Sequence, residues 1–372
     1  MANGSLSSEV FAGSSASRER GGYVCVTDAI TRRRRSSPGS LSAGRRDDDA
    51  VAYDPMTSPE LSNILDGLTR RHLGWDMPTS SSKPPTLLES ELFCRRLATS
   101  HYENFPLISW LLPGRLRQPF FNVYAYCRTS DDLADELDDR ELSTRMLAQW
   151  RGELARCWSG EEMGYPVFVA LQRTVKEFNL SREPFDDLLT AFEQDQRITS
   201  YSSFEELLGY CRNSANPVGR IVLRLCGCDD ERSVELSDSV CTGLQLANFW
   251  QDVARDAELG RTYLPLDDCE RFGYSRPDLA NRVTNEAFVE LMRYEVERAR
   301  GMLLAVRELA PRLRGRLQVV IELFGEGGLK ICDRVTSIGY HVWEQRPVVT
   351  KWDAAGLLLK CFSRAIGRKV AA

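Results

Sequence analysis

The segment TGLQLANFWQDVARD at residues 242–256 decides the fold prediction. Its apolar residues recur at helical spacing, and the same pattern extends over residues 234–257. Within this stretch Asn248, Asp252 and Asp256 follow one another at i, i+4 spacing, so a helix places them on one face as a polar ladder. Such a face is normally apolar when a helix is buried, and the ladder therefore indicates a function beyond packing.

A second acidic helix is predicted at residues 120–137, which include the segment YAYCRTSDDLADE at 124–136. Asp131 and Asp135 are i, i+4 neighbours about 6 Å apart on one face, with Arg128 one turn earlier and Tyr124 one turn before that. A single DxxxD pair is common on solvated helices, where it has no special role. Two pairs in separate, otherwise apolar helices are much less expected by chance, and we interpret them as one site.

Paired carboxylates of this kind suit the magnesium-assisted departure of a diphosphate. Mg²⁺ prefers oxygen ligands and is usually held by one or two carboxylates together with phosphate oxygens of the substrate. The bound ions neutralise the leaving group as its bond to carbon breaks. The predicted metal ligands are Asp131, Asp135, Asn248, Asp252 and Asp256. Arg128, Arg220 and Arg261 are predicted to hold phosphate oxygens in forked contacts, with an ordinary surface ion pair as the alternative for each.

Departure of a diphosphate leaves a carbocation, which requires a dry pocket and aromatic faces. Aromatic residues lie in or beside the helices concerned, namely Phe105, Phe121, Tyr124, Tyr210, Phe249 and Trp250. For any one of them core packing is the better interpretation. As a set they indicate an apolar pocket beside the carboxylates.

The remaining sequence predicts one all-α domain over residues 86–372. Apolar residues recur at helical spacing from Leu87 onward, and breaks such as Asn216-Pro217 fall between the stripes. Helices of this length form bundles that enclose a central cavity. Residues 1–85 are rich in Ser, Gly, Arg and Pro, and we expect them to be a disordered extension. A tail, a start codon assigned too early and an organellar transit peptide are the alternatives for that segment.

Composition narrows the class of protein further. The chain has 372 residues with 48 Lys+Arg against 53 Asp+Glu, and its net charge of −5 argues against a dedicated nucleic-acid-binding protein. The 11 Cys occur as scattered singles, which is typical of a reducing compartment, and the 3 His lie too far apart in sequence for a zinc pattern. No apolar run is long enough to span a bilayer, so we expect a cytoplasmic protein. Apolar and basic residues mix over residues 352–370, so this C-terminal helix either docks on the core or makes peripheral contact with a membrane.

At its motifs the sequence resembles the squalene/phytoene synthase family, whose members have the all-α isoprenoid synthase fold of class I terpenoid synthases. The resemblance rests on the two acidic segments, on GYCRNSANPVGR at 209–220 and on GRTYLP at 260–265. Three stretches look most like the hydroxysqualene synthases of the bacterial hopanoid branch: HYENFPLISWLLP at 101–113, SANPVGR at 214–220 and NFWQDVARD at 248–256.

The resemblance implies that presqualene diphosphate is converted to hydroxysqualene and diphosphate by ionisation, carbocation rearrangement and capture by water. It also implies several bound Mg²⁺ ions, no need for NADPH and a prenyl diphosphate substrate, with other enzymes of hopanoid synthesis as possible partners. Squalene synthase and phytoene synthase activities are the alternatives within this class. A non-catalytic scaffold relative is the alternative outside it, and the intact carboxylate pairs argue against it.

Residue by residue, the resemblance assigns the carboxylates Asp131, Asp135, Asp252 and Asp256 to catalysis through magnesium and diphosphate. The substrate-binding residues that it implies are Phe105, Tyr124, Arg128, Asp195, Tyr210, Gln245, Asn248 and Arg346. Arg220 and Arg261, predicted above from their charge, complete the set of expected substrate-binding residues. The glycine cluster at residues 325–328 does not match a dinucleotide-binding fingerprint, and we expect it to break a helix.

Overall fold

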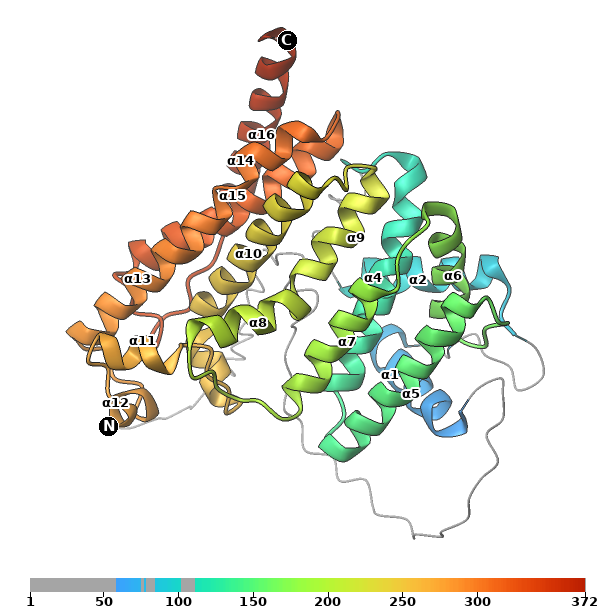
Figure 1. Ribbon diagram of the computed structural model, residues 1–372, viewed down its shortest axis with the longest axis horizontal. Coiled ribbons are helices and arrows are strands. Elements are labelled where there is room, and N and C mark those ends of the chain that lie inside the picture. The colour runs from blue at the N-terminus through green and yellow to red at the C-terminus, as the bar shows by residue number, and fades with distance from the viewer. Residues whose placement is uncertain (1–57, 75–76, 78–83, 102–110, 372) are drawn as a thin grey trace, which may run out of the picture.

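The computed structural model describes residues 58–74, 77, 84–101 and 111–371, and it confirms the all-α prediction (Figure 1). Within these ranges no β-strand is present, and an isolated β-bridge joins Ser200 to Thr262. The helices in chain order are α1 (Pro59–Leu73), α2 (Leu87–His101), α4 (Gly114–Asp135), α5 (Arg140–Ser159), α6 (Pro166–Phe178), α7 (Glu183–Asp195), α8 (Phe204–Ser214), α9 (Asn216–Cys226), α10 (Glu231–Glu258), α11 (Leu266–Arg271), α12 (Arg276–Ala280), α13 (Glu286–Leu303), α14 (Val306–Leu309), the 3₁₀ helix η1 (Ala310–Arg312), α15 (Arg316–Ser337) and α16 (Lys351–Ala371).

The helices pack in two groups that α9 joins. In one group α4 contacts α2, α5, α6 and α7, and in the other α10 contacts α9, α13 and α15. Because α9 also contacts α4 and α7, the two groups share one core (Figure 1). The two helices that were predicted to be acidic, α4 and α10, therefore lie inside the bundle, one in each group.

The central position of α10 follows from its sequence. Asp230 caps its N-terminus, where the side chain accepts a hydrogen bond of 3.2 Å from the backbone N–H of Ser233. Gly243 allows α13 to approach closely, because a Cβ at this position would lie 2.9 Å from Cγ of Leu303. Most of the residues from Gly243 to Val253 are consequently buried, polar ones included.

The predicted break at Asn216-Pro217 is confirmed. Helix α8 ends at Ser214, Ala215 has φ −121° and ψ −49°, and α9 begins at Asn216 with Pro217 in its first turn. Proline is tolerated there because the first N–H groups of a helix have no partner within the helix.

The glycine cluster at 325–328 does not break a helix, and this prediction is wrong. Helix α15 runs through the cluster from Arg316 to Ser337. A Cβ at Gly325 would lie 2.5 Å from Cβ of Val306, and one at Gly328 would lie 2.7 Å from Cδ2 of Leu244. These glycines are therefore required for close packing of α15 against α14 and α10, and their flexibility is suppressed by the surrounding helix.

The predicted boundary at residue 85 also needs correction. Residues 59–73 form α1, which buries Leu61, Leu65 and Leu68 against the core and contacts α2 and α5. The segment is too short to stabilise itself as an isolated helix, so its composition alone suggested disorder, and its order comes from tertiary packing. The expectation for residues 1–57 lies outside the described residues.

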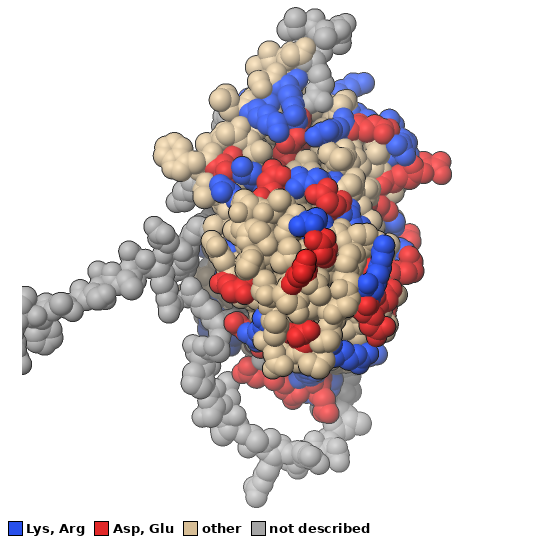
Figure 2. All heavy atoms as spheres, turned by 90° about the vertical axis from the view of Figure 1, so that its left-hand side faces the viewer, with Lys and Arg blue, Asp and Glu red and all other residues tan. Residues whose placement is uncertain are grey.

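The C-terminal helix α16 projects from one end of the bundle (Figure 1). It packs against α15. None of the helices in the described ranges is long and apolar enough to cross a membrane. Over the face seen in Figure 2 acidic and basic side chains are largely interspersed.

Candidate active site

The first carboxylate pair lies near the C-terminal end of α4. Asp131 is only 2% exposed, and its Oδ2 accepts a hydrogen bond of 3.1 Å from Nη1 of the equally buried Arg128. Asp135, one turn later, is half-buried. Its Oδ1 accepts a hydrogen bond of 3.2 Å from Nη2 of Arg261. The i, i+4 spacing thus places both carboxylates toward guanidinium groups, as the helical face predicts.

The second pair lies on α10. Arg346 forms a forked contact with Asp252, with Nε 2.7 Å from Oδ1 and Nη2 3.3 Å from Oδ2. Asp256 and Asn248 are buried, at 1% and 4% exposure. Two turns or more before the carboxylates, Gln245 is 1% exposed, and within the described ranges neither atom of its amide has a hydrogen-bond partner. A buried amide in this state is expected to face a ligand or ordered water.

Arg261 connects the two helices. It follows Gly260, whose φ of 70° turns the chain at the end of α10, and its backbone N–H donates a 2.8 Å hydrogen bond to the carbonyl of Asp256. Its guanidinium then reaches Asp135 on α4. Burial lowers the pKa of Arg261, but the negative charges around it, Asp195 foremost, outweigh this effect and raise the pKa above its usual value.

Asp195 lies at the C-terminal end of α7, where Tyr210 of α8 donates a 3.0 Å hydrogen bond to its Oδ2. The chain just beyond Asp195 is held against the chain after Arg261, because the backbone N–H of Thr262 donates to the carbonyl of Thr199 at 2.7 Å. This pairing explains how an acid on α7 comes to act on an arginine that is distant in sequence.

Aromatic rings surround this junction. Tyr263 stacks on Phe249, with ring centroids 3.8 Å apart and an angle of 6° between the planes. Tyr210 lies 6.0 Å from Tyr263 and 5.6 Å from Tyr201, centroid to centroid. Sequence reasoning missed Tyr201 and Tyr263, although Tyr263 lies in the quoted GRTYLP segment. Its position two residues after Arg261 was the available signal.

The carboxylates crowd one another electrostatically. Burial raises the pKa of Asp131 well above its ordinary value; Arg128 opposes this effect, while the neighbouring acids Asp135, Asp132 and Asp195 add to it. A site that holds several acids in a buried space is stabilised by bound cations. Carboxylate and amide oxygens are also the donors that Mg²⁺ prefers. The residues fit this metal, and the ligands that we expect are Asp131, Asp135, Asn248, Asp252 and Asp256.

Of the remaining predicted residues, some lie near the acidic helices and others do not. Tyr124 is half-buried on α4, and its hydroxyl acts on the pKa of Arg128. Phe105 lies outside the described residues. The apolar substrate pocket that it was predicted to border therefore stays a prediction. Arg220 is not brought to the carboxylates: its Nε and Nη2 contact Asp238 at 3.1 Å and 2.7 Å. Asp238 precedes Asp252 by fourteen residues on α10, which is about 21 Å along the helix axis.

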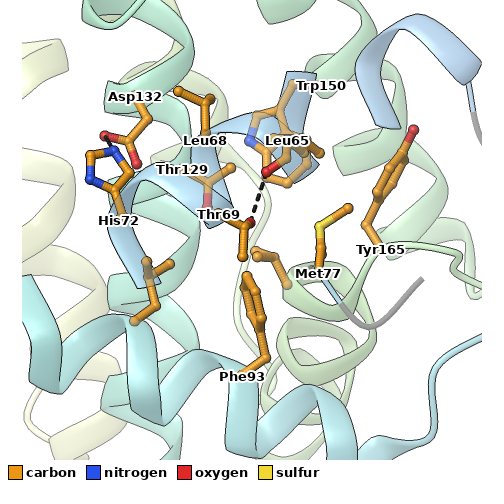
Figure 3. Close-up of a pocket in the computed structure, with 12 residues that line it drawn as sticks. Leu65, Leu68, Thr69, His72, Met77, Phe93, Thr129, Asp132, Trp150 and Tyr165 are labelled. Carbon is orange, nitrogen blue, oxygen red and sulfur yellow. Dashed lines mark hydrogen bonds and ion pairs between the residues drawn. The ribbon is translucent and has the colours of Figure 1, made fainter. Parts of the chain in front are cut away.

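A further acidic cluster was not predicted from the sequence. His72 of α1 lies beside Asp132 of α4 (Figure 3), with its Nε2 3.5 Å from Oδ1 of Asp132. The same Nε2 lies 3.8 Å from Oε1 of Glu136, the residue that follows α4. Arg128 reaches the same two carboxylates. No local pattern predicts this cluster, since its histidine is far from α4 along the chain.

The chain is similar in sequence to known proteins of one family. The family model described as squalene/phytoene synthase matches residues 98–353. A phytoene synthase of Arthrospira platensis is 31% identical over 286 residues, which are 72% of this chain and 91% of that protein. A hydroxysqualene synthase of Rhodopseudomonas palustris is 33% identical over 218 residues, which are 58% of this chain and 73% of that protein.

Solved structures also resemble the chain. The crystal structure of squalene synthase HpnC from Alicyclobacillus acidocaldarius is 40% identical, with a TM-score of 0.66 over 70% of this chain and 97% of that one. A dehydrosqualene synthase in complex with a ligand has a TM-score of 0.68 at 24% identity, over 76% of this chain and 98% of that one, and shows the same terpenoid synthase helical fold. By the match of the family model over most of its helical part, this chain belongs to the squalene/phytoene synthase family of isoprenoid synthases.

Proposed function

We propose that this chain is a magnesium-dependent enzyme that converts presqualene diphosphate to hydroxysqualene and diphosphate. The observation that carries the proposal is the junction at Arg261, whose backbone N–H donates to the carbonyl of Asp256 at the end of α10 and whose guanidinium contacts Asp135 on α4. Asp131 and Asp252 contact arginines of their own, Arg128 and Arg346. Such alternation of buried acids and guanidinium groups suits a leaving group that carries several negative charges and arrives with cations.

In this proposal the arginines bind the diphosphate. Arg128, Arg261 and Arg346 exchange their carboxylate contacts for phosphate oxygens, to which guanidinium groups make equally well-shaped forked contacts. Magnesium, when bound by the aspartates, supplies further charge neutralisation to the leaving group. The aromatic rings of Tyr210, Phe249 and Tyr263 exclude water from the neighbouring space and offer their faces to positive charge.

The overall change balances without a reductant. The bond from carbon to the diphosphate oxygen breaks with its electron pair on oxygen, and the carbocation that remains rearranges. The oxygen of a water molecule then forms the new carbon–oxygen bond and releases a proton. No hydride is transferred, so we expect turnover without NADPH.

The 33% identity to a hydroxysqualene synthase favours this product, whereas the 40% identity to squalene synthase HpnC favours squalene. The main alternative is head-to-head joining of two prenyl diphosphates to phytoene, which the 31% identity to a phytoene synthase favours. Cation fate depends on pocket shape and water access, and the acidic motifs are common to all of these activities.

Product analysis separates these activities. The purified chain is incubated with Mg²⁺ and presqualene diphosphate, farnesyl diphosphate or a longer prenyl diphosphate, with and without NADPH, and the extracted products are identified by mass spectrometry. Hydroxysqualene from presqualene diphosphate without NADPH is expected. Squalene formed only with NADPH, or phytoene formed from a longer prenyl diphosphate, would contradict the proposed product.

Matched substitutions on α10 test the metal and diphosphate site. Asp252→Asn is expected to abolish turnover while the circular dichroism spectrum is unchanged, and Asp131→Asn on α4 is expected to do the same. Asp238→Asn, on the same helix as Asp252 but paired with Arg220, should keep turnover. Retained turnover in Asp252→Asn would refute the role of this carboxylate.

We also propose a peripheral membrane contact through α16. Trp352, Leu359 and Ile366 are 87%, 72% and 63% exposed, and their seven-residue spacing places them along one side of the helix. Another side of the helix is held to α15, where Lys360 and Arg364 contact Glu326 at 2.6 Å each. Exposed Trp and aliphatic side chains of this kind favour a lipid interface.

Flotation with phospholipid vesicles tests this contact. The wild-type chain should float, and a variant with Leu359→Ser and Ile366→Ser should not. Leu304→Ser removes an exposed leucine outside α16 and should leave flotation unchanged. A wild-type chain that stays in the soluble fraction would contradict the proposed contact.

A further inference from the structure

Arg128 bridges two faces of α4. Asp131 and Asp135 lie on the face toward the candidate active site, and Asp132 and Glu136 lie about 100° further around the helix. Nη1 of Arg128 donates to Asp131 at 3.1 Å, while Nη2 contacts Oδ1 of Asp132 and lies 3.6 Å from Oε1 of Glu136. Asp132 and Glu136, which lie on the face away from the site, therefore help to orient the guanidinium of Arg128 toward it.

The two rear carboxylates are themselves held by α1. Nε2 of His72 lies 3.5 Å from Asp132 (Figure 3). It lies 3.8 Å from Glu136. Arg71 contacts Glu136 twice, with Nη1 3.0 Å from Oε2 and 3.4 Å from the backbone oxygen. A continuous set of contacts thus runs from α1 through Asp132 and Glu136 to Arg128.

This cluster differs in kind from a metal site. His72, Asp132 and Glu136 offer three ligand atoms within 4.8 Å of one another. However, Nη2 of Arg128 already contacts the carboxylate oxygens of Asp132 and Glu136 that lie nearest to His72. Arg71 contacts the other carboxylate oxygen of Glu136. These carboxylates are therefore already paired with guanidinium groups, and we interpret the cluster as an anchor for Arg128.

The docking of α1 is specific at both ends. Its apolar face packs beside Phe93 and Trp150, around the small cavity drawn in Figure 3. At the end away from the cluster, Oγ of Ser62 lies 3.2 Å from the hydroxyl oxygen of Tyr165. Helix α1 precedes residues 98–353, the part of the chain that matches the family model.

We propose that α1 is a working part of the active site, in which His72 and Arg71 are positioning residues that fix Arg128 for a diphosphate through Asp132 and Glu136. The inference rests on the proposed function, since it requires that Arg128 binds diphosphate. A guanidinium that is held in its binding orientation loses less conformational freedom when the ligand arrives. Release of the anchor should therefore weaken diphosphate binding without removing any group that touches the ligand.

Binding of inorganic pyrophosphate in the presence of Mg²⁺, measured by isothermal titration calorimetry on the full chain, tests the inference. His72→Ala and Arg71→Ala are each expected to weaken binding about tenfold, the lower end of the effect of groups that orient a ligand-binding residue. His72→Gln keeps an N–H group at a similar position and should restore most of the affinity. Ser62→Ala removes a contact of α1 with the body at the other end and should bind as the wild type does.

Each outcome decides between specific positioning and mere packing. If Ser62→Ala weakens binding as much as His72→Ala, then α1 affects binding only because it packs on the rest of the protein, and the inference fails. It fails equally if His72→Ala binds pyrophosphate as the wild type does. A wild-type chain that binds no pyrophosphate would overturn the proposed function, and the inference with it. Thermal unfolding of each variant, recorded in parallel, shows whether a loss of binding reflects a loss of folded protein.

Discussion

Replacing Arg261 by Gln removes the positive charge that joins α10 to α4 at the candidate active site. Nη2 of Arg261 lies 3.2 Å from Oδ1 of Asp135, and the two side chains are 18% and 17% exposed. Asp195 acts on the same guanidinium from α7. The variant therefore leaves these acids and Asp131 close together with less positive charge among them.

The size of the effect follows from the burial of the pair. Breaking a fully buried ion pair costs about 3–5 kcal/mol, whereas an exposed pair contributes about 0–1 kcal/mol. At less than one fifth exposure the Arg261–Asp135 pair lies nearer the buried limit. We therefore expect Arg261→Gln to lower the free energy of unfolding by about 3 kcal/mol. In a chain of this size that loss lowers the melting temperature by roughly 4 °C.

Thermal unfolding with and without Mg²⁺ provides the assay. Because Mg²⁺ binds to the same acids in our proposal, it should recover part of the lost stability in Arg261→Gln. Arg151→Gln is the matched control, since Arg151 contacts Asp186 and Glu193 at 3.0 Å each, away from the site. The loss of stability in Arg151→Gln should be the same with and without Mg²⁺. The reasoning is refuted if Arg261→Gln melts with the wild type, or if Mg²⁺ restores both variants equally.

Three further predictions concern the fold, its pH dependence and one reassigned residue. Gly328→Ala should destabilise by about 1–3 kcal/mol in urea unfolding, because its Cβ would lie 2.7 Å from Cδ2 of Leu244, whereas Gly327→Ala, with nothing within 4 Å, should not destabilise. Burial raises the pKa of the fully buried Glu295 to about 8, so the wild type should lose stability relative to Glu295→Gln as the pH rises from about 5 to 8; an unchanged difference in urea unfolding would contradict this. Arg220→Gln should keep turnover, because both contacts of this guanidinium are made outside the acidic junction; lost turnover would support the substrate contact that the sequence suggested.

Much of the fold was predictable because its signals are local. The i, i+4 spacing of Asp131 and Asp135 and of Asp252 and Asp256 depends only on the helical backbone, and both pairs lie on helices as expected. The break at Asn216-Pro217 follows from the covalent chemistry of proline. These features need no information about which helix lies beside which.

The errors have the opposite origin. Gly325 and Gly328 were expected to end a helix because glycine lowers helix propensity, yet the close approach of α14 and α10 selects them for their small size. Helix α1 was assigned to a disordered segment because polar and small residues surround it. Its apolar residues stabilise a helix only because they pack against α2 and α5, and the local sequence does not reveal these contacts.

The sequence by itself determined that this chain is a helical protein with two acidic helix faces, and motif by motif it indicated the family. The tertiary structure decided which cation each carboxylate meets. Arg261 reaches Asp135 across two helices, Arg220 turns to Asp238 instead, and His72 comes to the rear of the first motif. The physical reason is that spacing along one helix is set by its own backbone hydrogen bonds, whereas contacts between helices depend on how the whole core packs.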